Sequence, residues 1–203
     1  MKRADVTGLI LAGGQATRLG GIDKRLVVVA GRTIFDRQVE ALAPCVAEIV
    51  VSARRAVHQR GEIAGFRTVA DDVADVGPLA GIAAGLVAVT TPWLFVLAGD
   101  MPWVSRALIA LVLARADDES DAVGIRIGSR PQPLCTALRT EVWRPIVTGR
   151  IAAGLLKASA LLTDVQARVR WIEEGEVRGV DPELRSLHNV NAASDIPSDI
   201  PSD

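Results

Sequence analysis

The amino-acid sequence predicts an α/β protein of three layers, in which a mostly parallel sheet carries helices on both faces. Three observations predict this class. Short apolar runs alternate with longer amphipathic runs along the chain. The short runs are hydrophobic almost throughout, as in strands that are covered on both faces. The chain has 203 residues, 49% of them hydrophobic, which is enough to fill one core.

The first half of the chain predicts four strands and two helices. The strands cover residues 6–11, 46–51, 66–70 and 93–98. Helical spacing predicts a first helix over 35–43 and a second over 78–89, because their apolar residues recur on one face. Those apolar residues are Phe35, Val39 and Leu42 in the first helix, and Leu79, Ile82, Ala83 and Leu86 in the second.

The second half predicts a buried helix over 105–116, with Ser105 as its N-cap. Residues 121–127 alternate in polarity, which predicts a half-exposed strand near a sheet edge, with 133–138 paired beside it. Residues 141–162 are helical in character, and Pro145 and Gly149 are expected to divide them into two pieces. Residues 169–173 form the last expected strand.

The domain organisation is expected to be simple, with residues 1–195 in one domain. The final stretch SDIPSDIPSD repeats a proline-containing tetrad, which favours neither a helix nor a strand. We therefore expect residues 196–203 to be a disordered tail.

Composition excludes several classes of partner. The formal net charge of −1 argues against nucleic-acid binding, which usually needs an excess of Lys and Arg. The apolar stretch near the start is too short for a signal core or a membrane span. Only Cys45 and Cys135 are present, so a disulfide framework is not expected and a cytoplasmic location fits better.

The stretch LILAGGQATRLGGIDKRL, residues 9–26, joins a strand end to a glycine-rich loop. Glycines allow successive backbone N–H groups to converge on an anion, and Arg18 and Lys24 add positive charge. A phosphate chain is the ligand that this pattern favours at the carboxyl edge of a parallel sheet. Neither the GxGxxG nor the GxxxxGK[ST] spacing is present, and a flexible turn is the alternative.

Acidic residues follow two further strands. In LFVLAGDMP, an apolar strand ends in Gly99-Asp100-Met101-Pro102. The Asp100 carboxylate could hold Mg²⁺ near the phosphates, or Asp100 could simply begin a turn. Asp71 and Asp72 follow another strand and could accept hydrogen bonds from a base or a ribose, or lie in a solvated loop.

Together these motifs resemble one family. LAGGQATRLGGIDKRL, GPLAGIAAGL, LAGDMP, RPQPL and NVNAASDI, in this order between about Gly8 and Asp195, resemble the molybdenum cofactor guanylyltransferases of the MobA type. The resemblance implies a Rossmann-like nucleotide-diphospho-sugar transferase fold. It also implies transfer of GMP from GTP to the terminal phosphate of molybdenum-loaded molybdopterin, with release of pyrophosphate.

The resemblance also implies the site residues. Arg18, Lys24 and Asp100 would be catalytic, with Asp100 as the Mg²⁺ ligand. The nucleotide would contact Leu11, Ala12, Gly13, Gly14, Lys24, Ser52, Asp72, Gly77, Pro78, Leu79 and Asp100. Ser52 stands in VVSARR, near where the family often carries an Asn. The pterin side would be bordered by Arg130, Gln132, Pro133, Asn189 and Asn191.

The implied nucleophile is a phosphate monoester, which is already anionic, so no side-chain base is needed. His58 and His188 are accordingly given no catalytic role. The alternatives are a cytidylyltransferase, a sugar-phosphate nucleotidyltransferase, or a non-catalytic adaptor that binds GTP or cofactor. Retention of Lys24 and Asp100 favours an enzyme over an adaptor. The 49% hydrophobic content and the four tryptophans fit either ordinary core packing or transient docking to molybdoenzymes or their chaperones.

Overall fold

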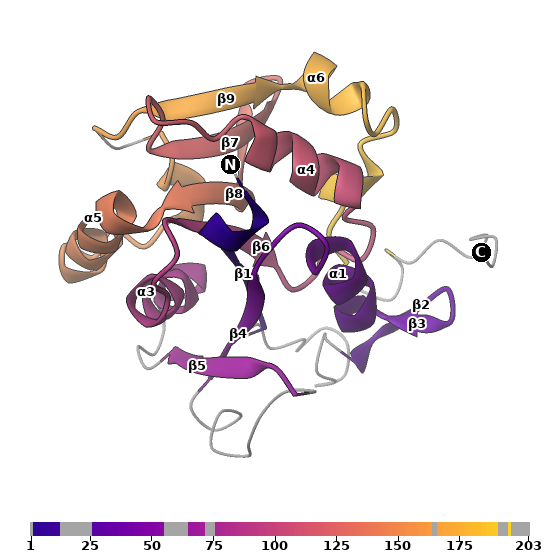
Figure 1. The fold of residues 1–203 in the computed structure, drawn as a ribbon, viewed down its shortest axis with the longest axis horizontal. Helices are drawn as coiled ribbons and strands as arrows, with labels where there is room; N and C mark the ends of the chain where they lie inside the picture. The colour runs from indigo at the N-terminus through magenta and orange to yellow at the C-terminus, as the bar shows by residue number, and fades with distance from the viewer. Residues whose placement is uncertain are drawn as a thin grey trace.

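The computed structural model describes residues 2–12, 26–54, 65–71, 76–163, 166–190 and 195. A seven-stranded sheet runs through the molecule in the order β5-β4-β1-β6-β8-β7-β9 (Figure 1). Its strands are β1 (Val6–Leu11), β4 (Glu48–Arg54), β5 (Arg67–Asp71), β6 (Trp93–Ala98), β7 (Ala122–Ile127), β8 (Arg130–Arg139) and β9 (Val169–Glu173). Only β8 among these strands runs antiparallel to its neighbours.

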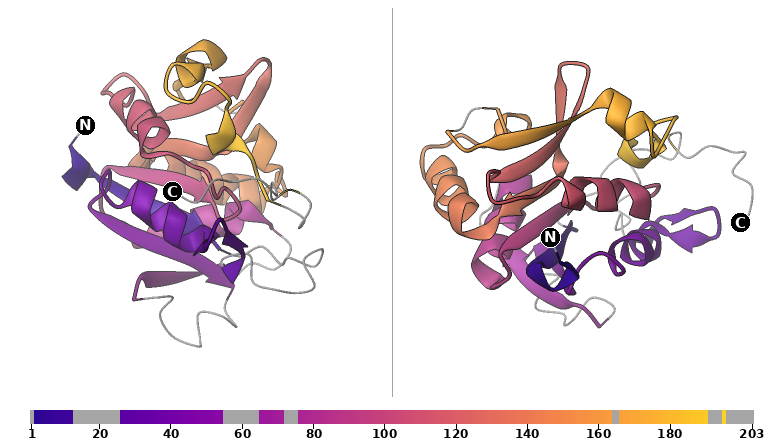
Figure 2. Two further views of the ribbon diagram at one scale, coloured as in Figure 1. Left: turned by 90° about the vertical axis from the view of Figure 1, so that its right-hand side faces the viewer. Right: turned by 45° about the horizontal axis from the view of Figure 1, so that its top comes forward.

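Helices cover both faces of the sheet. One face carries α1 (Ile34–Leu42) and α4 (Arg106–Ala114), and the other carries α3 (Pro78–Ala88) and α5 (Thr140–Ala152) (Figures 1 and 2). The short α6 (Glu174–Arg178) follows β9, and 3-10 turns cover Arg3–Asp5, Ala158–Ala160 and Arg185–Leu187. The predicted three-layer α/β class with a mostly parallel sheet is confirmed.

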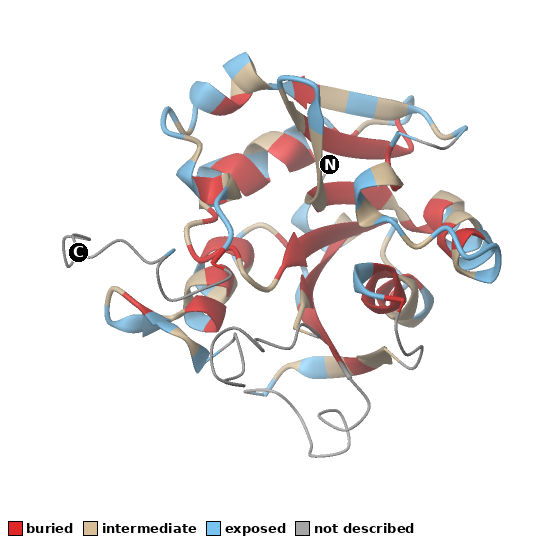
Figure 3. Cartoon of the chain, turned by 180° about the vertical axis from the view of Figure 1, so that it is seen from behind, coloured by how far each residue is buried: buried red, intermediate tan, exposed pale blue. Residues whose placement is uncertain are grey.

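The core consists of two large apolar clusters, one on each face of the sheet. Phe35 and Leu42 of α1 pack with Phe95 on one face, and Ile82 and Leu86 of α3 pack on the other. The central strands are buried along most of their length (Figure 3). Continuous burial of β1 and β6 explains why their apolar runs have no alternation.

The predicted strands 6–11, 93–98 and 169–173 match β1, β6 and β9 residue for residue, and 66–70 lies one residue from β5. The strand expected at 46–51 begins at Glu48 and continues to Arg54. The helices over 35–43, 78–89 and 105–116 are confirmed as α1, α3 and α4. Ser105 caps α4, since its hydroxyl accepts a hydrogen bond from the backbone N–H of Leu108.

The expected division of residues 141–162 at Pro145 and Gly149 is wrong, because α5 runs continuously from Thr140 to Ala152. Trp143 and Val147 are fully buried on either side of Pro145, and their packing holds the helix together. Pro145 and Glu141 are exposed. The proline therefore lies on the solvent side of α5, away from the buried face that packs on the sheet.

The expected position of residues 121–127 near a sheet edge is confirmed, but the expected half-exposed character is wrong. β7 lies inside the sheet between β8 and β9, and β9 forms the edge. Four of the six residues of β7 are buried, because Val123 and Ile125 pack into the core cluster on one face of the sheet and Ala122 into the cluster on the other. The pairing of residues 133–138 beside this strand is confirmed in β8.

A small two-stranded hairpin, β2 (Val28–Val29) and β3 (Arg32–Thr33), precedes α1 and was not predicted. It packs against the C-terminal segment through Val29 and Val190, which are both fully buried. The expected tail, 196–203, lies outside the described residues, and the assignment of 1–195 to one domain stays a prediction. Among the described helices, none combines the length and apolar character that crossing a membrane requires.

Candidate active site

Three parallel strands, β4, β1 and β6, end side by side at the carboxyl-terminal edge of the sheet, the side where the parallel strands end. Leu11 at the end of β1 is aligned with Ser52 of β4 and with Ala98 at the end of β6. The backbone N–H of Ala12 donates to the carbonyl oxygen of Ser52 at 2.8 Å, and that of Gly99 donates to Leu11 at 3.1 Å. The segments that leave β1 and β6 therefore begin next to each other, as expected for a ligand-binding edge of a doubly wound sheet.

Asp100 lies in the turn after β6 at this edge. It is half-buried, and one oxygen of its carboxylate is inaccessible to solvent. The preceding residue must be glycine, because a Cβ atom at position 99 would lie 2.4 Å from the carbonyl oxygen of Leu11. The close approach of β1 to the turn thus fixes the position of the Asp100 backbone, from which the carboxylate extends.

The amino-terminal end of α3 approaches the same edge. Gly77 is the N-cap with a φ of 68°, a conformation that favours glycine, and Pro78 occupies the first turn. Both residues are exposed, whereas Leu79 is fully buried. Gly81 lets α3 lie close to β4, since a Cβ there would be 2.4 Å from the Ser52 hydroxyl oxygen.

Ser52 is buried beneath this helix, and its hydroxyl oxygen has no hydrogen-bond partner among the described residues. Its backbone carbonyl oxygen, by contrast, accepts a hydrogen bond from the N–H of Ala12. Within the described structure, Ser52 therefore acts on the segment after β1 through its main chain.

The residues expected on the pterin side come from two places in the chain. Arg130 is exposed, and Gln132 and Pro133 are half-buried, all in β8. β8 pairs with β6 as far as the match of Cys135 with Leu97. Because β8 is antiparallel to β6, Pro133 and Gln132 continue beyond this last pair, towards the edge where Asp100 lies.

Asn189 is exposed, and its neighbour Val190 joins it to the acidic turn. The backbone N–H of Val190 donates to the carbonyl oxygen of Asp100 at 2.8 Å. His188 meets Trp103 edge to face, with ring centroids 6.5 Å apart. The segment 188–190 therefore lies against the turn that carries Asp100.

Six of the expected site residues lie outside the described residues, so their roles stay predictions. They are Gly13, Gly14, Arg18, Lys24, Asp72 and Asn191. His58 falls outside them too.

Gln38 was missed in the sequence. Its side-chain amide nitrogen donates to the carbonyl oxygens of Ala98 at 2.7 Å and of Met101 at 3.3 Å, although it belongs to α1. The available signal was its spacing from Phe35 and Leu42, which places a polar side chain on the buried face of the helix. Buried polar groups are rarely left without a hydrogen-bonding task.

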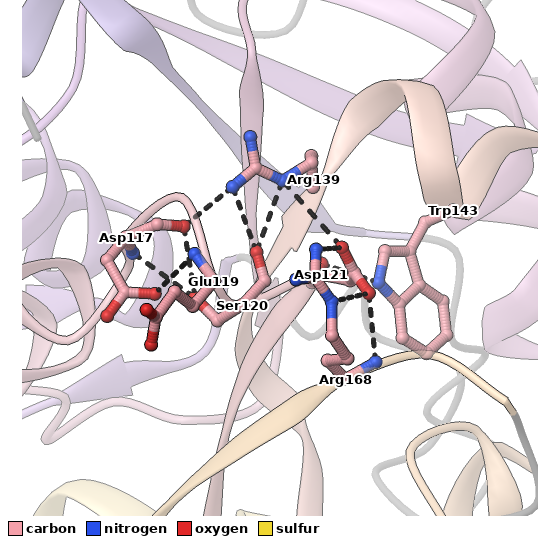
Figure 4. Close-up of polar contacts among 7 residues, drawn as sticks. All are labelled: Asp117, Glu119, Ser120, Asp121, Arg139, Trp143 and Arg168. Atoms are coloured by element: carbon pink, nitrogen blue, oxygen red, sulfur yellow. Dashed lines mark hydrogen bonds and ion pairs between the residues drawn. The ribbon is translucent and has the colours of Figure 1, made fainter.

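A polar network lies at the opposite, amino-terminal edge of the sheet, where β6 begins (Figure 4). The Arg168 guanidinium donates to both carboxylate oxygens of Asp121, at 2.8 and 3.0 Å, and lowers the pKa of Asp121 to about 2. Arg139 donates to the carbonyl oxygens of Ser120 and Asp117, and its guanidinium lies 4.8 Å from the Trp93 ring centroid. Because Trp93 begins β6, this network is structural and distant from Asp100.

The described residues offer little support for two other kinds of functional site, a multi-ligand metal centre and a reactive cysteine. No cluster of three or more His, Cys, Asp or Glu ligands occurs within the described ranges. Both cysteines are free. Cys135 is buried, and burial raises the pKa of its thiol to about 12, so it stays protonated at neutral pH.

The chain is similar to known proteins over most of its length. Residues 8–167 match the model of the MobA-like NTP transferase domain. A protein of Methanosarcina acetivorans named "Probable molybdenum cofactor guanylyltransferase" is 32% identical, covering 97% of this chain and 90% of its own. A molybdenum cofactor guanylyltransferase of Desulfosudis oleivorans is 31% identical, covering 94% and 92%.

The fold is shared with solved structures. Molybdopterin-guanine dinucleotide biosynthesis protein A from Archaeoglobus fulgidus superposes with a TM-score of 0.73 at 24% identity, covering 94% of each chain. The predicted nucleotide-diphospho-sugar transferase fold is thereby confirmed.

Proposed function

The chain belongs to the family of MobA-like NTP transferases, and from this premise we propose that it transfers GMP from GTP to the terminal phosphate of molybdenum-loaded molybdopterin. The observation that carries the proposal is that the sequence relatives bearing this guanylyltransferase name align over nearly the whole chain. The alignment thus includes the acidic turn and the segment at Val190 that contacts it.

The reaction is a displacement at phosphorus. An oxygen of the molybdopterin phosphate forms a bond to the α-phosphorus of GTP, and the bond from that phosphorus to the bridging oxygen breaks. Pyrophosphate leaves with the electron pair. The attacking phosphate is already anionic at neutral pH, so the site needs no base to remove a proton.

The main task of the protein is then to hold two polyanions together. We assign the nucleotide to the edge where β4, β1 and β6 end, against Leu11, Ala12, Gly13 and Gly14. Arg18 and Lys24 would neutralise the phosphates, in the way that preorganised charge stabilises such reactions. Asp72 and Ser52, with Gly77, Pro78 and Leu79 at the start of α3, would border the nucleoside.

Asp100 is the residue that would hold a divalent cation, and we propose Mg²⁺. Within the described residues, Asp100 is not part of a group of three or more His, Cys, Asp or Glu ligands. A site with few protein ligands fits Mg²⁺, which commonly takes one or two carboxylates and completes its shell with water and substrate phosphates. When bound, the ion would supply charge neutralisation for the departing pyrophosphate.

The acceptor would lie on the other side of Asp100. Arg130, Gln132 and Pro133 of β8 and the asparagines at 189 and 191 are proposed to border the pterin. The hydrogen bond from Val190 to Asp100 supports this assignment, because it holds Asn189 next to the acidic turn. Transient docking to molybdoenzymes or their chaperones and a cytoplasmic location are also proposed, the latter because both cysteines are free.

The test is product formation. The purified protein is incubated with Mg²⁺, molybdenum-loaded molybdopterin and either GTP or CTP, and the products are identified by mass. The proposal expects molybdopterin guanine dinucleotide and pyrophosphate from GTP, with little product from CTP. A cytosine dinucleotide as the main product would identify a cytidylyltransferase, and GTP that stays bound but intact would favour the adaptor.

A further inference from the structure

The turn Ala98–Met101, which carries Asp100, is held by three separate parts of the chain. The N–H of Gly99 donates to Leu11 of β1, and the carbonyl oxygen of Asp100 accepts from Val190. The carbonyl oxygens at both ends of the turn accept from the side chain of Gln38 in α1. The backbone on both sides of Asp100 is therefore held by more hydrogen bonds than is usual for a loop.

Gln38 is 1% exposed and lies on the face of α1 that is turned towards the sheet. Its amide nitrogen carries two hydrogens, so it can supply one to Ala98 and one to Met101. A Met or Leu side chain would fill the same space but would donate to neither carbonyl. An Asn side chain is one methylene shorter and would not span the same distance.

These two acceptors bracket Gly99 and Asp100. Fixing the carbonyls of Ala98 and Met101 fixes the path of the backbone between them, and hence the direction in which the Asp100 side chain leaves it. The tight fit of Gly99 against Leu11 leaves the turn little room for another path. Small errors in the placement of a group that acts on reacting phosphates reduce rates strongly.

We propose that Gln38 is a positioning residue that orients the Asp100 carboxylate towards the divalent cation of a bound nucleoside triphosphate. This inference rests on the proposed function for the identity of the nucleotide. It adds that a buried amide on α1 sets the affinity of the site for the cation, although it touches neither the cation nor the nucleotide. Partners behind a metal-binding carboxylate commonly change metal affinity or activity by about 10–100-fold when they are removed.

A merely structural role for Gln38 would give a different result. Loss of two hydrogen bonds would then lower stability alone, and its effect would add to that of any change at Asp100. A positioning role predicts coupling, because orientation of a carboxylate matters only while the carboxylate is present.

The experiment compares Gln38→Met, Asp100→Ala and the double variant with the unchanged protein. Thr140→Val is the matched control, since it removes a partly buried hydrogen bond from the Thr140 hydroxyl to the carbonyl oxygen of Thr91, near the start of β6 and far from Asp100. Mn²⁺ binding is measured by electron paramagnetic resonance in the presence of a non-hydrolysable GTP analogue. Turnover and urea unfolding are measured on the same samples.

We expect Gln38→Met to weaken Mn²⁺ binding by about 10-fold or more and to lower kcat more than it raises the KM for GTP. In the Asp100→Ala background the same change should have little further effect. Unchanged Mn²⁺ affinity in a folded Gln38→Met protein, or effects that multiply in the double variant, would overturn the inference. If the unchanged protein binds Mn²⁺ with the analogue but makes no dinucleotide, the proposed function fails and Gln38 is still tested.

If Gln38→Met does not fold, Gln38→Glu replaces it, because Glu has the same shape. Glu donates one hydrogen bond when protonated and none when ionised. Positioning therefore predicts that its Mn²⁺ affinity, relative to the unchanged protein, falls as the pH rises. An affinity that increases with pH would indicate simple charge attraction and would overturn the inference.

Discussion

The backbone N–H of Val190 donates a hydrogen bond to the carbonyl oxygen of Asp100 at 2.8 Å. This contact joins the C-terminal segment to the turn that ends the central strand β6. It brings the proposed pterin side and the proposed cation ligand together, although they are far apart in the sequence. Substitutions at Asp100 should therefore affect the reaction of GTP, and substitutions at Val190 should affect the binding of the molybdopterin acceptor.

Asp100→Asn keeps the size of the side chain and removes its charge. We expect turnover to fall by about a hundredfold or more, because the carboxylate that would hold the charge-neutralising cation at the phosphates is lost. Steady-state release of pyrophosphate measures the loss, and an unchanged urea midpoint shows that the fold is intact. Full activity in this variant would refute the role of Asp100.

Lys24→Ala should also reduce turnover by about a hundredfold or more, since a positive charge assigned to the phosphates is removed. The binding of GTP should weaken in a calorimetric titration. Lys157→Ala, which removes an exposed lysine elsewhere, is the control and should behave as the unchanged protein. Equal behaviour of the two variants would show that Lys24 has no special part.

Val190→Ala should loosen the C-terminal segment. Val190 is fully buried with Val29 and Ile34, so the change should cost about 2 kcal/mol of unfolding free energy. We expect the KM for the molybdopterin acceptor to increase by about tenfold with little change in the KM for GTP. Val147→Ala, buried in α5, should lose similar stability and leave both KM values unchanged; if it also raises the acceptor KM, the effect is not local.

Gly99→Ala should impair both stability and turnover. The new Cβ would lie 2.4 Å from the Leu11 carbonyl oxygen, which forces β1 and the acidic turn apart at a cost of about 1–3 kcal/mol. Gly149→Ala is the control, because a Cβ at position 149 would meet no atom of another element within 4 Å, and it should stabilise α5 by about 0.5–1 kcal/mol. Thermal unfolding and pyrophosphate release measure the two effects, and an active, stable Gly99→Ala protein would contradict the described geometry.

Acid should weaken the fold through Asp121. Its pKa is about 2 in the folded protein, mainly because Arg168 donates hydrogen bonds to its carboxylate, against about 3.9 in an unfolded chain. The ion pair therefore stabilises the fold fully above about pH 5, and this contribution, about 1–2 kcal/mol, is lost as the pH falls towards 2. Asp121→Asn should be less stable at pH 7 and should show a shallower loss between pH 5 and 2; a parallel pH profile would contradict the assignment.

The sequence predicts most of the sheet because strand identity here is a local property. The apolar runs of β1 and β6 are buried on both faces, so their bounds coincide with the runs. The break expected at Pro145 was wrong because burial of Trp143 and Val147, a tertiary effect, outweighs a local preference. The interior position of β7 depends on pairing with β9, which no local pattern reports.

In the candidate site, too, the features set by local sequence could be predicted, and those set by contacts between distant segments could not. That Leu11 and Asp100 lie at one edge could be predicted, because parallel strands end at the same side of a sheet. The contacts of Gln38 and Val190 with the acidic turn could not, because they join distant segments through backbone carbonyls that carry no sequence signal.

The central claim is that a purine triphosphate binds at the edge where β1 and β6 end, next to the Asp100 carboxylate. A crystal structure of the protein with Mg²⁺ and a non-hydrolysable GTP analogue tests it most directly. We predict the triphosphate beside Ala12 and the cation on Asp100. A triphosphate bound elsewhere, with this edge of the sheet empty, would contradict the account.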